Sequence, residues 1–128
     1  MERKVIEAKN APAAIGPYVH AVQAGDLVFT SGQLGIDVEK GGMADGIAAQ
    51  TEASLKNLKA ILNEAGCDAK DVVKTTIFLA DINDFATVNE IYGKFFEGGA
   101  PARSCFQVAA LPAGGLVEIE AIAVKPCK

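Results

Sequence analysis

The last apolar segment of the chain, residues 117–124, restricts the fold most, because apolar residues alternate in it with Glu118 and Glu120. Successive side chains of a β-strand point to opposite faces. A strand here places both glutamates on one face with Ile122 and Val124. It places four apolar residues on the other face: Val117, Ile119, Ala121 and Ala123. The segment therefore predicts a strand in a sheet that has one buried face and carries two carboxylates on the other.

A second strand is predicted after Pro101, and Arg103 lies at its entrance. Proline blocks helix formation, and alternation places Arg103 on the same face as Cys105 and Gln107. Arginine carries a permanent charge and binds a carboxylate with two hydrogen bonds. Arg103 and Glu118 could form a structural ion pair between strands. Alternatively, Arg103 could bind the carboxylate of a ligand while Glu118, beside it, acts as a base. The residues by themselves leave both interpretations open.

Two segments, residues 47–65 and 85–96, have the periodicity of amphipathic helices. Their apolar stripes are Leu55, Leu58, Leu62 and Ala65 in the first segment and Phe85, Val88, Tyr92 and Phe95 in the second. Gly66 and the pair at 98–99 are expected to end these helices, because glycine readily adopts the conformation that closes a helix. Both stripes are predicted to pack in the core.

The remaining apolar segments are separated by glycine, proline and aspartate, which favour turns. Besides the two C-terminal strands, strands are predicted at residues 4–8, 18–23, 27–31 and 72–80, and a loop at 35–46. This order predicts a single α+β domain over residues 1–128, with two helices packed on one face of a mixed, mostly antiparallel sheet. The other face has no helix to cover it, so a second copy of the chain is expected there.

Charge and hydropathy exclude several classes of partner. The chain has 128 residues, 50% of them hydrophobic, and a net charge of -4. This acidic balance disfavours nucleic acid and anionic membrane surfaces, and no apolar run is long enough to span a membrane. Because the N-terminal residues also lack the apolar core of a signal peptide, the protein is expected to be cytoplasmic.

The three cysteines, Cys67, Cys105 and Cys127, are widely spaced, and His20 is the single histidine. No CxxC pair or histidine cluster is present, so no metal site is expected. The thiols are expected to be reduced, as in a cytosolic protein. His20 is predicted to be a strand residue at the surface or at an interface.

Four groups of residues could converge if the strands pair as expected: Tyr18, the corner at Ser31–Gly32, Arg103 with Cys105, and Glu118. Each also has a plain structural interpretation. Tyr18 resembles a core aromatic residue, Cys105 a small buried apolar residue, and a glycine at a strand end marks a bulge or a close approach. Taken singly, these residues do not define a site.

Taken together, the motifs of the chain resemble the reactive-intermediate deaminase family, also called the RidA or YjgF family. The resemblance covers nearly the full length and lies in segments that occur in the family's order. They are 15–18 (IGPY), 30–33 (TSGQ), 50–51 with the leucines at 55–62, 73–76 (VKTT), 84–85, 88–92, 101–105 (PARSC) and 118–124 (EIEAIAV).

The resemblance implies a chorismate-mutase-like α+β fold and a homotrimer with a site in each cleft between subunits. It implies hydrolysis of 2-iminobutanoate and 2-iminopropanoate to 2-oxo acids and ammonia, which removes the reactive enamine and imine products of pyridoxal-phosphate-dependent dehydratases. No cofactor or metal is required for this chemistry. The resemblance also implies that Arg103 binds the substrate carboxylate and that Glu118 orients and activates water. Substrate contacts are implied for Tyr18, Ser31, Gly32, Asn89, Arg103 and Cys105.

Three alternatives remain at this point: a non-catalytic module that binds a small 2-oxo or short-chain acid, a chaperone-like protein, and an RNA-cleaving enzyme. The acidic charge and the absence of a histidine or lysine cluster disfavour RNA cleavage. Glu118 favours catalysis, because a module that only binds carboxylates gains nothing from a second negative charge beside its ligand. An apolar cleft would raise the pKa of Glu118 and Arg103 would lower it, and the sequence leaves this balance open.

Overall fold

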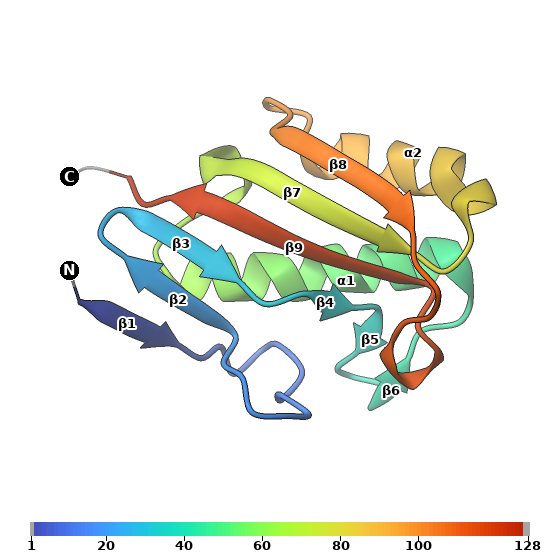
Figure 1. The fold of residues 1–128 in the computed structure, drawn as a ribbon, viewed down its shortest axis with the longest axis horizontal. Coiled ribbons are helices and arrows are strands. Elements are labelled where there is room, and N and C mark those ends of the chain that lie inside the picture. Colours follow the sequence, from blue (N-terminus) through green and yellow to red (C-terminus); the bar gives the residue numbers. More distant parts are fainter. Residues whose placement is uncertain (1, 127–128) are drawn as a thin grey trace.

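The computed structural model describes residues 2–126 and shows a sheet with two helices packed behind it (Figure 1). The helices are α1 (Gly46–Glu64) and α2 (Phe85–Phe95). The strands of the main sheet are β1 (Arg3–Ile6), β2 (Ala21–Ala24), β3 (Leu27–Thr30), β4 (Gln33–Leu34), β7 (Val72–Leu79), β8 (Ala102–Gln107) and β9 (Val117–Val124). Their order is β1-β2-β3-β9-β7-β8, with β4 also on β9. Only β7 and β8 pair in parallel in the described part of the chain, so the predicted α+β class is confirmed.

Two of the predicted elements differ from the structure. Residues 35–46, predicted as a loop, contain a small hairpin of β5 (Ile36–Asp37) and β6 (Gly42–Met43). Residues 18–20, predicted as part of a strand, precede β2, because the Tyr18 amide closes a tight turn onto the Gly16 carbonyl at 2.8 Å. Short 3₁₀ turns complete the chain: η1 (Ala69–Asp71), η2 (Ile82–Asp84) and η3 (Pro112–Gly114).

The core lies between the sheet and the two helices. Alternation in β9 buries its four apolar residues Val117, Ile119, Ala121 and Ala123, as predicted. The α1 leucines pack against them in the same cluster of buried residues. Helix α1 ends where the glycine predicts, because Gly66 has a φ of 83° and the amides of Gly66 and Cys67 bind the Asn63 and Leu62 carbonyls. This pair of bonds satisfies carbonyls that the helix end would leave unpaired.

Helix α1 also carries buried polar side chains that bind the segment after Gly32. Ser54 Oγ donates to the Gln33 carbonyl at 2.7 Å, and Asn57 Nδ2 donates to the Ile36 carbonyl at 2.8 Å. On the same helix, Gln50 Oε1 accepts from the Leu116 amide at 2.8 Å, just before β9. These bonds fix residues 33–36 and the start of β9 relative to the helix, because a buried polar group without a partner is costly.

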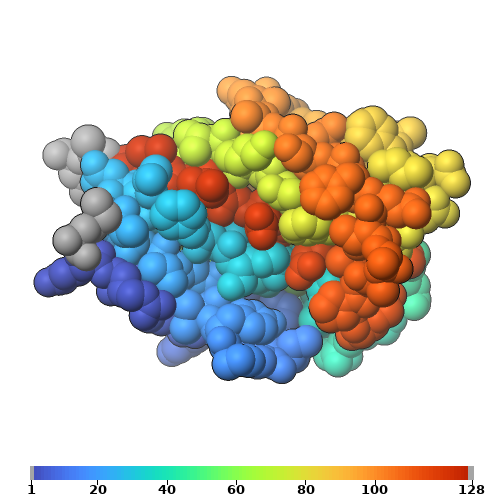
Figure 2. Space-filling view, in the orientation of Figure 1, coloured from blue at the N-terminus to red at the C-terminus, as the bar shows by residue number. Residues whose placement is uncertain are grey.

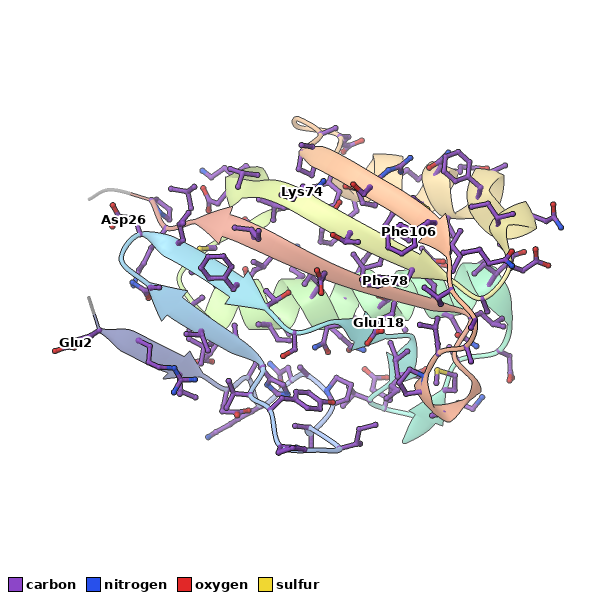
Figure 3. All side chains as sticks on the ribbon, viewed as in Figure 1. Glu2, Asp26, Lys74, Phe78, Phe106 and Glu118 are labelled. Atoms are coloured by element: carbon purple, nitrogen blue, oxygen red, sulfur yellow. The ribbon has the colours of Figure 1, made fainter. Side chains whose placement is uncertain are left out.

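The face of the sheet opposite the helices is open, and Figure 2 shows this face. Phe29 and Phe106 are 41% and 45% exposed there, and Phe106 meets Phe78 edge to face with 5.4 Å between ring centroids. Figure 3 labels Lys74, Phe78, Phe106 and Glu118 on this open face. Strand β7 has apolar side chains on both faces: Ile77 and Leu79 are buried under the helices, and Phe78 lies on the open face.

We expect Gly35→Ala to destabilise the protein, because a Cβ at Gly35 would lie 2.5 Å from the Cα and Cβ atoms of Gln50. Helix α1 would have to move away from the strand, at a cost of about 1–3 kcal/mol. Urea unfolding measures this change. Gly42→Ala is the matched control, since a Cβ there meets no atom within 4 Å. Equal stability of the two variants would contradict the close approach.

Candidate active site

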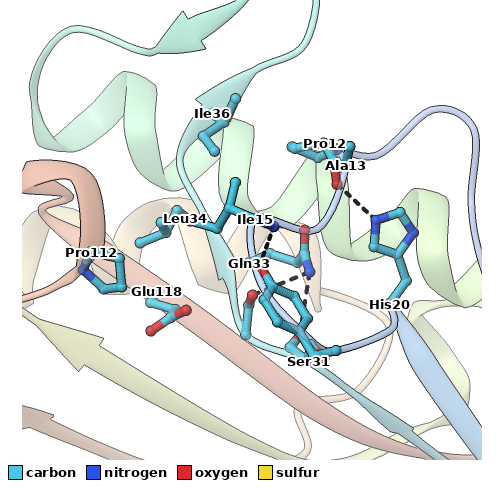
Figure 4. Close-up of a pocket in the computed structure, with 12 residues that line it drawn as sticks. Pro12, Ala13, Ile15, His20, Ser31, Gln33, Leu34, Ile36, Pro112 and Glu118 are labelled. Atoms are coloured by element: carbon cyan, nitrogen blue, oxygen red, sulfur yellow. Dashed lines mark hydrogen bonds between the residues drawn. The ribbon is translucent and has the colours of Figure 1, made fainter.

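Glu118 lies in a cleft with a volume of about 330 Å³, here called the Glu118 cleft (Figure 4). Four parts of the chain line it: the loop before β2, the segment from Ser31 to Ile36, η3 and β9. The lining residues are Pro12, Ala13, Ile15, Tyr18, His20, Ser31, Gly32, Gln33, Leu34, Ile36, Pro112 and Glu118. Three of the sequence-predicted site residues, Tyr18, Ser31 and Gly32, therefore lie in one cleft with Glu118.

Gly32 allows the backbone to pass directly against the Glu118 side chain. A Cβ at this position would lie 2.7 Å from Glu118 Oε2 and 2.8 Å from its carboxyl carbon. Phe29 pairs with Ile122 and Gln33 with Ile119, so residues 30–32 lie opposite only residues 120–121. The extra residue is a bulge-like irregularity, and it brings the Gly32 backbone to the carboxylate.

Ser31 and Tyr18 are held by bonds within the cleft wall. Ser31 Oγ donates to the Val19 carbonyl at 2.6 Å, and the Tyr18 hydroxyl accepts from the Ile15 amide at 3.3 Å. Tyr18 is 43% exposed, so its interpretation as a core residue is wrong. Its ring forms part of the cleft wall.

Burial raises the pKa of the Glu118 carboxyl above its ordinary value, and the nearby charge of Glu120 raises it further. Within one chain Arg103 does not offset this effect. Within one chain, burial and Glu120 therefore set the direction of the pKa shift of Glu118. A carboxylate with a raised pKa is a stronger base than an ordinary glutamate once it is ionised.

Arg103 belongs to a different cluster, here called the Arg103 cluster and formed by Phe85, Asn89, Tyr92, Arg103 and Cys105. The Arg103 Nη1 donates to Asn89 Oδ1 at 2.7 Å. Its guanidinium carbon lies 5.0 Å from the ring centroid of Tyr92 and 5.4 Å from that of Phe85. The Tyr92 hydroxyl is itself hydrogen-bonded to Thr75 Oγ1 at 2.6 Å. Helix α2 therefore orients the guanidinium, and no carboxylate pairs with it within residues 2–126.

Arg103 and Glu118 lie on opposite faces of the sheet within one chain. Arg103 pairs with Thr75, which is buried beneath the helices, whereas Glu118 pairs with Phe78 on the open face. The interpretation of Arg103 and Glu118 as an ion pair between strands of one chain is therefore wrong. The four groups expected to converge form two separate sets within the chain, because alternation sends the two side chains in opposite directions.

Cys105 lies on the same face as Arg103, and burial raises the pKa of its thiol. Arg103 has the opposite but smaller influence. A thiol with a raised pKa stays protonated and is a poor nucleophile. The side chain of Cys105 is therefore a packing group of the Arg103 cluster.

Within residues 2–126, no group of three or more His, Cys, Asp or Glu side chains is arranged to hold a metal ion. The same residues contain no helix that is both long and apolar enough to cross a membrane.

Sequence reasoning missed the side chains that support the Glu118 cleft from behind. Gln50, Ser54 and Asn57 are buried on α1, although polar residues on an amphipathic helix usually face solvent. Their spacing of three and four residues places them on one side of the helix. That spacing is the signal that could have identified them.

The chain belongs to the family described as Endoribonuclease L-PSP, which is the RidA/YjgF family, since the family's model matches residues 8–125. A 2-iminobutanoate/2-iminopropanoate deaminase of Mus musculus is 56% identical over 124 residues, which cover 96% of this chain and 92% of that protein. The deaminase of the same name from Salmonella typhimurium is 54% identical over 125 residues, 95% of this chain and 98% of that protein. A crystal structure of E. coli TdcF with bound serine has a TM-score of 0.92 at 48% identity and covers 96% of this chain and 99% of that chain.

We expect Glu120→Gln to lower the pKa of Glu118, because it removes the second cause of the raised value. The pKa should remain above the ordinary glutamate value, since burial is the larger cause. Carbon-13 NMR of the side-chain carboxyl groups measures both. Glu52→Gln, on the exposed side of α1, is the control and should leave Glu118 unchanged. A Glu118 pKa that does not respond to Glu120→Gln would contradict this account.

Proposed function

We propose that the protein is a 2-imino acid deaminase that hydrolyses 2-iminobutanoate and 2-iminopropanoate to the 2-oxo acids and ammonia. Several curated relatives that are 50–56% identical carry this activity in their names. The observation that carries the proposal is Glu118, a carboxylate of raised pKa placed in a cleft against the Gly32 backbone. The proposal assigns catalysis to Arg103 and Glu118.

A complete site would be formed between two copies of the chain in a homotrimer. The Glu118 cleft has a base and lacks a cation, and the Arg103 cluster has an oriented cation and lacks a carboxylate. The open face exposes Phe29 and Phe106, which supports association of copies through the sheet. In this arrangement Arg103 of one subunit faces Glu118 of the next.

Arg103 would bind the substrate carboxylate. Asn89 uses one N–H of the guanidinium, and the Tyr92 and Phe85 rings hold its plane. The remaining N–H groups can then donate two charge-assisted hydrogen bonds to a carboxylate. This contact fixes the adjacent imine carbon. The bound serine of E. coli TdcF, itself an α-amino acid with a carboxylate, supports a ligand of this class.

Glu118 would orient a water molecule toward the imine carbon and accept one of its protons. The water oxygen then forms the new C–O bond, and the C=N electrons go to nitrogen, which takes up a proton. In the collapse of this tetrahedral intermediate, the hydroxyl proton passes to nitrogen through Glu118, the C=O bond forms, the C–N bond breaks and ammonia leaves. Glu118 returns its proton during these steps and ends unchanged.

The other proposed contacts hold the substrate between these two groups. Tyr18 and Ser31 would provide hydroxyl groups, and the Gly32 and Cys105 backbones would approach the substrate closely. Asn89 would contact it or act through Arg103. Cys67 and Cys105 are both free thiols, which supports a reducing, cytoplasmic setting.

A module that binds a 2-oxo acid without catalysis is the second candidate, because Arg103 would serve it equally. Glu118 argues against it, since a carboxylate beside an anionic ligand weakens binding unless it has a chemical role. The name of the family also refers to an endoribonuclease activity. The acidic charge of the chain and the carboxylate in the cleft disfavour an RNA substrate.

We expect Glu118→Gln to lower kcat by roughly 10²–10⁴-fold, because it removes the base. Arg103→Ala should lower kcat/KM by about a hundredfold or more, because it removes a charged contact with the substrate. The assay couples a threonine dehydratase to the purified protein and follows release of 2-oxobutanoate. Arg3→Ala, at the other arginine, and Glu52→Gln are the matched controls. Full activity of Glu118→Gln would remove the role assigned to it, and an inactive wild-type protein would favour the binding module.

We expect a mixture of inactive Arg103→Ala and Glu118→Gln chains to regain activity, because each supplies the group that the other lacks. If subunits assort at random in a 1:1 mixture, about a quarter of the shared sites receive both intact groups. The two chains are unfolded and refolded together, and the activity is compared with that of each chain refolded separately. Activity that stays at the level of the single variants would show that both groups act within one chain.

A further inference from the structure

The middle of the open sheet face carries a band of polar side chains among the exposed aromatic residues. This polar band consists of Lys74, Thr76, Ser104 and Glu120. Thr76 pairs with Ser104 on β8 and with Glu120 on β9, so the band crosses three neighbouring strands. Alternation places its side chains on the open face, where Figure 3 labels Lys74. The face proposed to associate with other copies is therefore not uniformly apolar.

The two charged residues of the polar band have no oppositely charged partner among residues 2–126. The ion pairs of these residues are His20–Glu7, Lys40–Asp45 and Lys56–Glu39. Lys74 Nζ donates to Ser104 Oγ at 2.9 Å. Strand β7 lies between β8 and β9 in the sheet order, so Lys74 turns toward β8 and away from Glu120 on β9. Both charges therefore remain free to bind a group outside the chain.

Lys74 and Glu120 are already partly buried, and a copy packed on the open face would remove more water from them. A charge that is buried without a partner destabilises an interface, whereas an opposite charge beside it compensates that cost. The polar band carries one charge of each sign, so a second copy of the band supplies the partner that each charge lacks. This charge complementarity favours a second copy of the chain as the occupant of the face.

The arrangement proposed for the catalytic groups brings these two charges to the same contact. Lys74 is bonded to Ser104, which is adjacent to Arg103 in β8. Glu120 lies two residues from Glu118 in β9, a separation of about 7 Å along a strand. When Arg103 of one copy faces Glu118 of the next, Lys74 of the first copy is therefore carried toward Glu120 of the second.

We propose that Lys74 of one subunit forms an ion pair with Glu120 of the next, and that this pair fixes the register in which the two copies meet. The inference rests on the association of copies in the proposed function. Lys74 and Glu120 are then positioning residues. They hold Arg103 and Glu118 of adjoining subunits in line and do not contact the substrate.

Arg3 is another cation near the open face, where it borders a hollow together with Val22 and Phe29. It belongs to β1, at the opposite end of the sheet order from β8. The contact between Arg103 and Glu118 therefore does not carry Arg3 toward Glu120 as it does Lys74. Arg3 is the comparison cation in the experiment.

The experiment reverses each charge and measures assembly by analytical ultracentrifugation over a range of protein concentrations. Lys74→Glu places two carboxylates at every contact between copies, and Glu120→Lys places two ammonium groups there. We expect each variant to dissociate at concentrations roughly a hundredfold or more above those at which the wild type dissociates, because a buried charge loses its partner. Lys59→Glu and Glu64→Lys, at exposed positions of α1, are the matched controls and should assemble as the wild type does. A wild-type protein that is monomeric at all concentrations would overturn the inference.

An equimolar mixture of Lys74→Glu and Glu120→Lys chains distinguishes a pair between copies from a pair within one chain. Opposite charges meet wherever the two kinds of chain adjoin, which is at two of the three contacts in a mixed trimer. We expect mixing to move the dissociation range back toward that of the wild type. A pair within one chain is lost in both variants and cannot be restored by mixing, so the absence of rescue would overturn the inference. Rescue of Glu120→Lys by Arg3→Glu, but not by Lys74→Glu, would assign the pair to Arg3 and overturn it as well.

Circular dichroism shows whether each variant is folded. If a reversed variant is not, Lys74→Gln and Glu120→Gln chains are mixed in the same way, because the native Lys74 of one chain still meets the native Glu120 of the other. Assembly is measured without turnover, which separates this inference from the proposed function. Rescue by mixing in a protein that does not hydrolyse imines would refute the proposed function and leave the ion pair intact. An active deaminase whose reversed variants assemble normally would refute the ion pair alone.

Discussion

The hydrogen bonds between α1 and residues 33–36 are the constraint on which the candidate site depends. Ser54 and Asn57 bind this segment from behind, and the absence of a side chain at Gly35 lets it lie against the helix. With the segment fixed, Gln33 and Leu34 pair with β9, and the Gly32 backbone lies against Glu118. Buried polar groups must find partners, so the packing of the core and the shape of the cleft are determined together.

Strand alternation has the second large consequence. It directs Arg103 toward α2 and Glu118 toward the open face, so neither set of residues is a complete site in one chain. The same open face carries the exposed aromatic residues that favour association. In the proposed trimer, one interface would cover the exposed apolar surface. The same interface would bring Arg103 of one subunit to Glu118 of the next. Stability and activity would then depend on one interface.

Local patterns predicted most of the fold. The alternation in β9, the leucine stripe of α1 and the helix end at Gly66 all agree with the structure, because each depends on residues close in sequence. The polar residues of α1 and the inward position of His20 were missed. A buried amide or imidazole is stable only with its partner, and the partners of Asn57 and His20 belong to other segments of the chain. The spacing of the polar residues on α1 shows that they share one side of the helix, but their burial depends on partners remote in sequence.

The sequence by itself determined the class of fold and the family, and it predicted Arg103 and Glu118 as the catalytic residues. These conclusions rest on alternation, helical periodicity and short motifs, which depend only on the order of the residues in the chain. Only the tertiary structure decided that the two residues face apart and that, within one chain, burial and Glu120 raise the pKa of Glu118. Distances between segments remote in sequence control both, because the pKa of a carboxyl depends on the burial and charges around it in space.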